Sequence, residues 1–132
     1  PPYLCMADYT LGQRLSYYWL FEGDLKSDLD SEIGARRNRF SPQKAFDRYQ
    51  EDMFKFFSNS YALLRENGYL ALVIGAPVAD SYKEKPILNN MKKFAVDTGF
   101  KLIWNTKREI HWHRNHGYAR LKNEQIIVFQ KS

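Results

Sequence analysis

The feature that most constrains the fold is a continuous apolar run in the middle of the chain, YLALVIG at residues 69–75. Apolar residues that continue without alternation over this length are typical of a strand buried on both faces, as in a parallel sheet. Asn67-Gly68 stands directly before the run, and this pair tolerates the left-handed backbone that ends a helix. The sequence therefore predicts a buried strand that follows a helix.

Two predicted helices flank this strand. Ser41-Pro42 is a typical helix start, because serine caps a helix and proline fits its first turn. Pro86 begins the second helix, and Gly99 ends it. Apolar residues recur at helical spacing in both segments, which predicts one buried stripe on each helix. These residues are Phe46, Tyr49, Met53, Phe56, Phe57, Tyr61 and Leu64 in the first helix, and Ile87, Leu88, Met91, Phe94 and Ala95 in the second.

Residues 100–106 and 124–130 are further apolar runs that predict strands. The connection between them, residues 107–123, is polar, basic and aromatic, and it contains no helical pattern. Two strands joined without a helix are expected to pair antiparallel. Helices that alternate with buried strands favour an α/β layered sheet, here with an antiparallel final hairpin.

The segment before the first long helix is less regular. Residues 10–21 predict a short helix, because Leu11, Leu15 and Trp19 recur at helical spacing and Asp8 or Thr10 can cap it. Residues 22–40 predict a long irregular insert with an acidic half followed by a basic half. Such charges most often form solvated surface, although a basic run near a substrate cleft can bind phosphates. The acidic residues are Asp24, Asp28 and Asp30, and the basic ones Arg36, Arg37 and Arg39.

Composition narrows the class of protein. With 132 residues, of which 44% are hydrophobic, the chain can form one domain with a core. No apolar run approaches the roughly 20 residues of a membrane-spanning helix. The single cysteine, Cys5, excludes an internal disulfide and fits the reducing cytoplasm, which is the predicted location. The net charge of +5 favours a polyanionic partner.

The first three residues, Pro1-Pro2-Tyr3, carry the strongest chemical signal. Two consecutive prolines fix φ and remove two backbone donors, so the segment is stiff and extended, with carbonyl oxygens free to accept hydrogen bonds. Tyr3 follows with a flat aromatic ring. This geometry suits a site that holds a flat group by one face and an amine by backbone oxygens.

These residues resemble the central motif of the nucleic-acid amino-methyltransferases, in which Asp, Asn or Ser precedes Pro-Pro-Tyr. The order of elements behind them is similar to the second half of a class I methyltransferase domain, with residues 63–75 resembling its helix end and fifth strand and residues 97–100 its next helix stop. The resemblance implies part of a Rossmann-like sheet with helices on both faces and an antiparallel final hairpin. Residues 1–132 would form the catalytic-motif half of that domain.

The same resemblance implies the chemistry. The methyl donor is S-adenosylmethionine, and the acceptor is the exocyclic amine of a base flipped out of DNA, with cytosine slightly favoured over adenine. Pro1, Pro2 and Tyr3 would be the catalytic residues: the Pro1 carbonyl accepts a hydrogen from the amine, and Tyr3 stacks on the base. The alternatives are an RNA or protein-glutamine amino-methyltransferase, or a catalytically inactive nucleic-acid-binding module with the same fold.

The cofactor half of such a domain is not visible in the sequence. No two of the seven glycines are two residues apart, as they would be in the G-x-G turn with which the family binds its cofactor. We therefore expect S-adenosylmethionine to be bound mainly by residues outside this chain, in the remainder of the methyltransferase domain. Residues 1–132 alone are expected to be inactive, to expose the edge of the strand at residues 69–75 and to aggregate.

The final connection and the basic run supply the predicted nucleic-acid contacts. Basic residues interleaved with aromatic ones suit phosphates and an unstacked base. A solvated loop is the commonest alternative, and His111, His113 and His116 leave a metal site open, although we predict none because no cysteine joins them. The predicted nucleic-acid contacts are Arg108, His113, Arg114, Arg120 and Lys122 in the connection, and Arg36, Arg37 and Arg39 in the insert.

Overall fold

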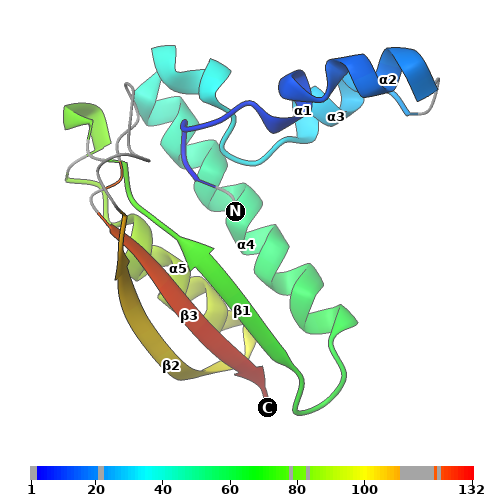
Figure 1. Ribbon diagram of the computed structural model, residues 1–132. Helices are drawn as coiled ribbons and strands as arrows, with labels where there is room; N and C mark the ends of the chain where they lie inside the picture. The colour runs from blue at the N-terminus through cyan, green and yellow to red at the C-terminus, as the bar shows by residue number, and fades with distance from the viewer. Residues whose placement is uncertain (1–2, 21–22, 78, 83, 111–120, 122) are drawn as a thin grey trace.

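The described part of the chain combines helices with a small sheet (Figure 1). The computed structural model describes residues 3–20, 23–77, 79–82, 84–110, 121 and 123–132. None of the helices described there is both long enough and apolar enough to cross a bilayer. The elements are α1 (Tyr9–Gly12), α2 (Arg14–Leu20), α3 (Leu25–Ser31), η1 (Arg36–Phe40), α4 (Pro42–Leu63), β1 (Tyr69–Ile74), η2 (Asp80–Tyr82), α5 (Ile87–Thr98), β2 (Phe100–Glu109) and β3 (Asn123–Lys131).

The three described strands form an antiparallel sheet in the order β1-β3-β2. β2 and β3 pair antiparallel, as predicted from a connecting sequence without a helical pattern, with Phe100 opposite Lys131 and Arg108 opposite Glu124. β1 also pairs antiparallel with β3, with Tyr69 opposite Gln130. The last strand therefore lies between the other two, which leaves the second edge of β1 without a partner strand in the described part of the chain.

Burial in β1 differs from the prediction of a strand covered on both faces. Leu72 and Ile74 are buried, whereas Tyr69 and Ala71 are exposed. The physical reason is that α4 and α5 pack against each other and cover the same face of the sheet. The expectation of helices on both faces is therefore not met among the described elements.

An aromatic cluster joins the two long helices to the covered face. Phe57 of α4 makes edge-to-face contacts with Phe100 of β2 and Phe129 of β3, at centroid distances of 6.4 and 5.7 Å. Met91 of α5 is fully buried in the same core. The apolar stripes predicted for both helices are confirmed in part, since Phe46, Tyr49, Met53, Phe57, Ile87, Met91 and Ala95 are all buried.

The ends of the long helices follow the predicted signals. Pro42 occupies the first turn of α4, although Ser41 makes no side-chain capping hydrogen bond. Gly99 ends α5 with a φ of 111°, and Asn67 turns the chain into β1 with a φ of 62°. Both angles lie in the left-handed region, where glycine and asparagine are the least strained residues.

Residues 9–31 form a helical arm that projects from the end of α4 (Figure 1). The predicted helix at 10–21 is two helices, α1 and α2, which are separated at Gln13. The prediction that residues 22–40 are irregular is wrong, because they contain α3 and η1. The Asp24 side chain caps α3 by accepting from the backbone N–H groups of Lys26 and Ser27 at 3.0 and 3.3 Å. α3 has only seven residues and buries none of them, and its two leucines are too few to predict a helix.

The two ends of the arm are held together by the segments that flank it. The Cys5 N–H donates to the Gly34 carbonyl at 2.7 Å, and the Arg36 N–H donates to the Ala7 carbonyl at 3.0 Å. The Glu32 carboxylate accepts from the Tyr9 N–H at 2.6 Å. The chain therefore leaves the core beside Tyr3 and returns to the same place, so the arm is a closed excursion next to the predicted motif.

Candidate functional site

Tyr3 is fixed at both of its ends. Its hydroxyl donates a hydrogen bond to Oε1 of Glu124, the second residue of β3. Leu4, directly after it, is completely buried in the core. Because the main chain is anchored and the hydroxyl is bound, the ring of Tyr3 has little freedom to tilt.

Gly34 lies against the backbone of the motif. Its φ is +72°, and a Cβ atom added at this position would stand 2.6 Å from the Tyr3 carbonyl oxygen and 3.3 Å from the Tyr49 ring. Cys5 has a φ of 55°, a conformation that few residues with a side chain adopt. The segment that carries Tyr3 is thus packed closely against the returning chain, and only glycine leaves room for that contact.

Arg108 joins Tyr3 through the same glutamate. Its Nε donates to Oε2 of Glu124 at 2.9 Å, and its Nη2 donates to the same oxygen. The Glu124 side chain is 7% exposed, whereas the Arg108 side chain is 59% exposed. We call these three residues the Tyr3–Glu124–Arg108 cluster. It brings a predicted catalytic residue and a predicted nucleic-acid contact to one place.

The three arginines of the basic run have different surroundings. Arg37 forms ion pairs with Asp8 at 3.3 Å and Glu32 at 2.8 Å, and its backbone N–H donates to Asp8. The Asp8 side chain therefore binds Arg37. It does not cap α1, because it accepts no hydrogen bond from the backbone N–H groups of that helix. The guanidinium of Arg39 lies 4.9 Å from the centre of the Phe40 ring, on the exposed side. Arg36 is partly buried. Of the three, Arg37 is the least suited to phosphate, because two carboxylates already compensate its charge.

Six predicted site residues lie outside the described part of the chain: Pro1, Pro2, His113, Arg114, Arg120 and Lys122. His111 and His116, which the alternative metal site requires, lie outside it too. Within the described residues, no group of three His, Cys, Asp or Glu side chains is arranged to hold a metal ion.

Cys5 lies beside the motif in a buried position. The Tyr82 hydroxyl donates to its Sγ at 3.2 Å. Burial raises the pKa of the Cys5 thiol, the negative charge of Asp8 raises it further, and the Tyr82 hydrogen bond opposes this by favouring the thiolate. The thiolate is the nucleophilic form of cysteine, so this thiol is packed rather than poised for attack.

We therefore expect Cys5 to react slowly with a soluble thiol reagent. In the native protein at pH 8 the rate should be at least about tenfold below that of the protein unfolded in denaturant, because burial limits access and disfavours the thiolate. The chain has one cysteine, so the colour released by a disulfide reagent reports this position alone. Equal rates in the native and unfolded protein would contradict the burial of Cys5.

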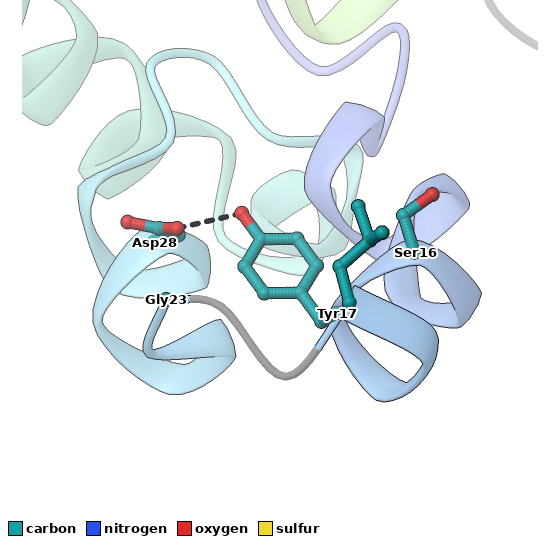
Figure 2. Close-up of a pocket in the computed structure, with 5 residues that line it drawn as sticks. Ser16, Tyr17, Gly23 and Asp28 are labelled. Atoms are coloured by element: carbon teal, nitrogen blue, oxygen red, sulfur yellow. Dashed lines mark hydrogen bonds between the residues drawn. The ribbon is translucent and has the colours of Figure 1, made fainter.

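The helical arm carries a shallow pocket of its own (Figure 2). The Tyr17 hydroxyl points toward α3 and donates to the Asp28 carboxylate at 2.6 Å, which raises the pKa of Tyr17. The other lining residues are Ser16, Leu20 and Gly23. None of the predicted site residues lines this pocket, and its hydrogen bond serves to join α2 to α3.

Sequence reasoning missed Glu124 and Gly34. The sequence analysis gives Glu124 no role beyond its place in a strand, although a carboxylate in a strand needs partners if it is buried. Gly34 lies in a stretch predicted to be irregular, and a glycine in such a stretch does not by itself indicate a close contact. Only the fold shows that it returns to the backbone of Tyr3.

No protein-family model matches the chain, and comparisons with curated proteins and with solved structures find no similar protein.

Proposed function

We propose that this chain carries the base-binding part of a methyltransferase that acts on the exocyclic amine of a flipped-out base in DNA, with cytosine favoured over adenine. The observation that best supports it is the Tyr3–Glu124–Arg108 cluster. It places an oriented aromatic ring directly after the Pro-Pro pair and joins it, through one carboxylate, to a half-exposed arginine. The resemblance of residues 1–3 to the amino-methyltransferase motif supplies the reaction class.

Each residue has a defined task in this proposal. An exocyclic amine is a weak nucleophile, because its lone pair is delocalised into the ring of the base. The Pro1 carbonyl accepts one of its hydrogens and directs the lone pair out of the ring plane. Tyr3 stacks on the base, a contact worth roughly 1–3 kcal/mol. Catalysis then depends on positioning and electrostatics more than on a strong base.

The methyl group would come from S-adenosylmethionine, which supplies an electrophilic methyl sulfonium when bound. The described residues do not fit this cofactor. No G-x-G turn is present in the sequence, and the closest approach of a glycine to the motif, at Gly34, is filled by the Tyr3 backbone. We therefore propose that the cofactor is bound mainly outside residues 1–132.

The sheet is the basis for proposing a Rossmann-like class I domain, which further elements would complete. In the described part of the chain, β1 has one edge without a partner strand, and such an edge accepts another strand. The face opposite α4 and α5 carries apolar side chains that no described helix covers. These residues are Tyr69, Ala71 and Val73 on β1, Trp104 on β2, and Ile126 and Val128 on β3.

The proposed function is tested by the transfer of a labelled methyl group from S-adenosylmethionine. The protein, with the remainder of its methyltransferase domain, is incubated with duplex DNA, with RNA and with a glutamine-containing peptide in parallel. We expect label in DNA. Label only in RNA or only in peptide would move the activity to that acceptor, and DNA binding without any transfer would favour the inactive binding module.

The basic residues predict a measurable salt dependence. Neutralising Arg108, Arg114, Arg120 and Lys122 together should flatten the dependence of log affinity for DNA on log salt by about one unit per lost phosphate contact. Arg108 should contribute least of the four, because Glu124 already compensates its charge. The measurement is a fluorescence anisotropy titration at several salt concentrations.

Two variants serve as controls for this titration. Lys93→Gln removes an exposed charge from α5 and should leave the slope unchanged. Arg37→Gln should lower stability through the loss of its pairs with Asp8 and Glu32, without changing the slope. A quadruple variant with the slope of the unmodified protein would show that these residues are solvated surface.

Cofactor affinity tests the proposed division of the domain. Calorimetry on monomeric residues 1–132 should show S-adenosylmethionine binding at least about 100-fold weaker than in the complete protein, because the described residues form no cradle for the cofactor. Equal affinity for the two would place the cofactor site within this chain and contradict the proposal.

A further inference from the structure

Glu124 is a buried carboxylate whose two oxygens both have partners. Oε1 accepts from the Tyr3 hydroxyl, and Oε2 accepts from the Arg108 guanidinium. A buried charge is costly unless it is paired and hydrogen-bonded. Here the two contacts satisfy it, and they bind segments that are 121 and 16 residues away in the sequence.

The side of the cluster formed by the sheet is stiff. Arg108 and Glu124 are directly opposite each other in the β2–β3 ladder, so backbone hydrogen bonds fix their spacing. Tyr3 comes from a segment outside the sheet, and its main chain is held by the burial of Leu4 and the contact with Gly34. Its hydroxyl links its ring to the sheet through the bond to Glu124.

We propose that Glu124 is a positioning residue that sets the plane of the Tyr3 ring. Main-chain anchoring fixes one end of the side chain, but the ring can still turn about its side-chain torsions. The bond to Glu124 fixes the other end, and Arg108 keeps the carboxylate in place. This inference rests on the proposed function, in which Tyr3 is the surface that receives the base.

Such a role has a distinct kinetic signature. A base that stacks on a misoriented ring is bound but badly placed for transfer, and small errors of placement are costly in rate. Glu124→Gln keeps the size of the side chain but removes its charge and presents an amide to Arg108. We expect kcat for methyl transfer to fall about tenfold, while the DNA concentration at half-maximal rate changes less than threefold.

A double-mutant cycle separates positioning from a general structural role. Glu124→Gln, Tyr3→Phe and the double variant are compared at saturating DNA and cofactor in the complete protein. If Glu124 acts through the Tyr3 hydroxyl, Glu124→Gln should lower kcat less than twofold once Tyr3 is Phe. The same tenfold loss in both backgrounds would overturn the inference. Glu109→Gln makes the same chemical change at an exposed position of β2 and should have no effect.

A spectroscopic measurement keeps the inference testable without activity. In protein labelled with 3-fluorotyrosine, the ¹⁹F signal missing from the Tyr3→Phe spectrum belongs to Tyr3. It should shift and broaden in Glu124→Gln and stay unchanged in Glu109→Gln. An unchanged signal in Glu124→Gln would overturn the inference. If the protein transfers no methyl group but the signal responds, the proposed function fails and the orienting contact stands.

Thermal melting shows whether Glu124→Gln folds. If it does not, Arg108→Gln is the second variant, because it leaves the Tyr3–Glu124 bond in place and releases only the other oxygen. The Tyr3 signal should then broaden to a smaller extent. An Arg108→Gln variant that folds with an unchanged Tyr3 signal would overturn the part assigned to Arg108.

Discussion

Replacing Tyr3 with alanine is expected to lower kcat for methyl transfer roughly 5- to 150-fold, which corresponds to the loss of about 1–3 kcal/mol of stacking. Tyr3→Phe keeps the ring and loses only the bond to Glu124, so its kcat should stay above that of Tyr3→Ala. The measurement is single-turnover transfer of labelled methyl groups to DNA by the complete protein.

The fold provides the control for this comparison. The hydroxyl of Tyr3 is bonded to Glu124, so both variants leave one buried carboxylate oxygen without that donor. Tyr3→Ala also loses the packing of a partly buried ring, so the difference between the rates of the two folded variants reports the ring. A Phe variant as slow as the Ala variant would contradict stacking as the task of Tyr3.

Replacing Gly34 with alanine should have the second large effect. The added Cβ would stand 2.6 Å from the Tyr3 carbonyl oxygen and 3.1 Å from its carbon, and the φ of +72° is itself unfavourable for alanine. Because both obstructing atoms are backbone, neither can rotate away. We expect a loss of roughly 2–4 kcal/mol in the free energy of unfolding, from the strained φ and the overpacking together.

Gly12→Ala is the matched control. Gly12 lies in α1, its φ is not positive, and an added Cβ would meet nothing within 4 Å. Since alanine favours a helix over glycine by about 0.5–1 kcal/mol, this variant should be neutral or slightly more stable. Urea unfolding of the two variants side by side is the measurement. A Gly34→Ala variant as stable as Gly12→Ala would contradict the close contact with Tyr3.

The parts of the fold that could be predicted have short-range causes. Pro42 and Gly99 mark helix ends through their own backbone geometry, and the apolar stripe of α4 follows from its packing against the sheet. The antiparallel pairing of β2 and β3 was expected because the sequence between them carries no helical pattern. Each of these signals is contained within a few residues of the element it describes.

Other parts depend on contacts that are distant in sequence. An apolar run such as residues 69–75 shows that a strand is apolar but not which faces are covered, and here α4 and α5 share one face. α3 is held by the Asp24 cap and by the contacts that close the arm, and its seven residues are too few to show a helical period.

The candidate site also has residues that the sequence identifies and contacts that only the fold shows. Tyr3 was identified from its motif, and Arg108 from its place in a basic connection. Their meeting at Glu124 required the register of β2 and β3 and the return of the N-terminal segment to the sheet. For Arg37 the fold weakens the expectation from sequence. Its charge predicted a contact with phosphate, whereas in the fold it pairs with two carboxylates.

The position of the new methyl group on the base tests the central claim most directly. DNA treated with the complete protein and S-adenosylmethionine is digested to nucleosides, which are separated and identified by mass spectrometry. Transfer to an exocyclic amine predicts N4-methylcytosine, and N6-methyladenine would keep this chemistry while reversing the preference for cytosine. Methylation of a cytosine ring carbon needs a nucleophile that attacks the base, and the one cysteine is buried with a raised pKa. A product methylated at a ring carbon, or DNA without any methylated nucleoside, would contradict the proposed function.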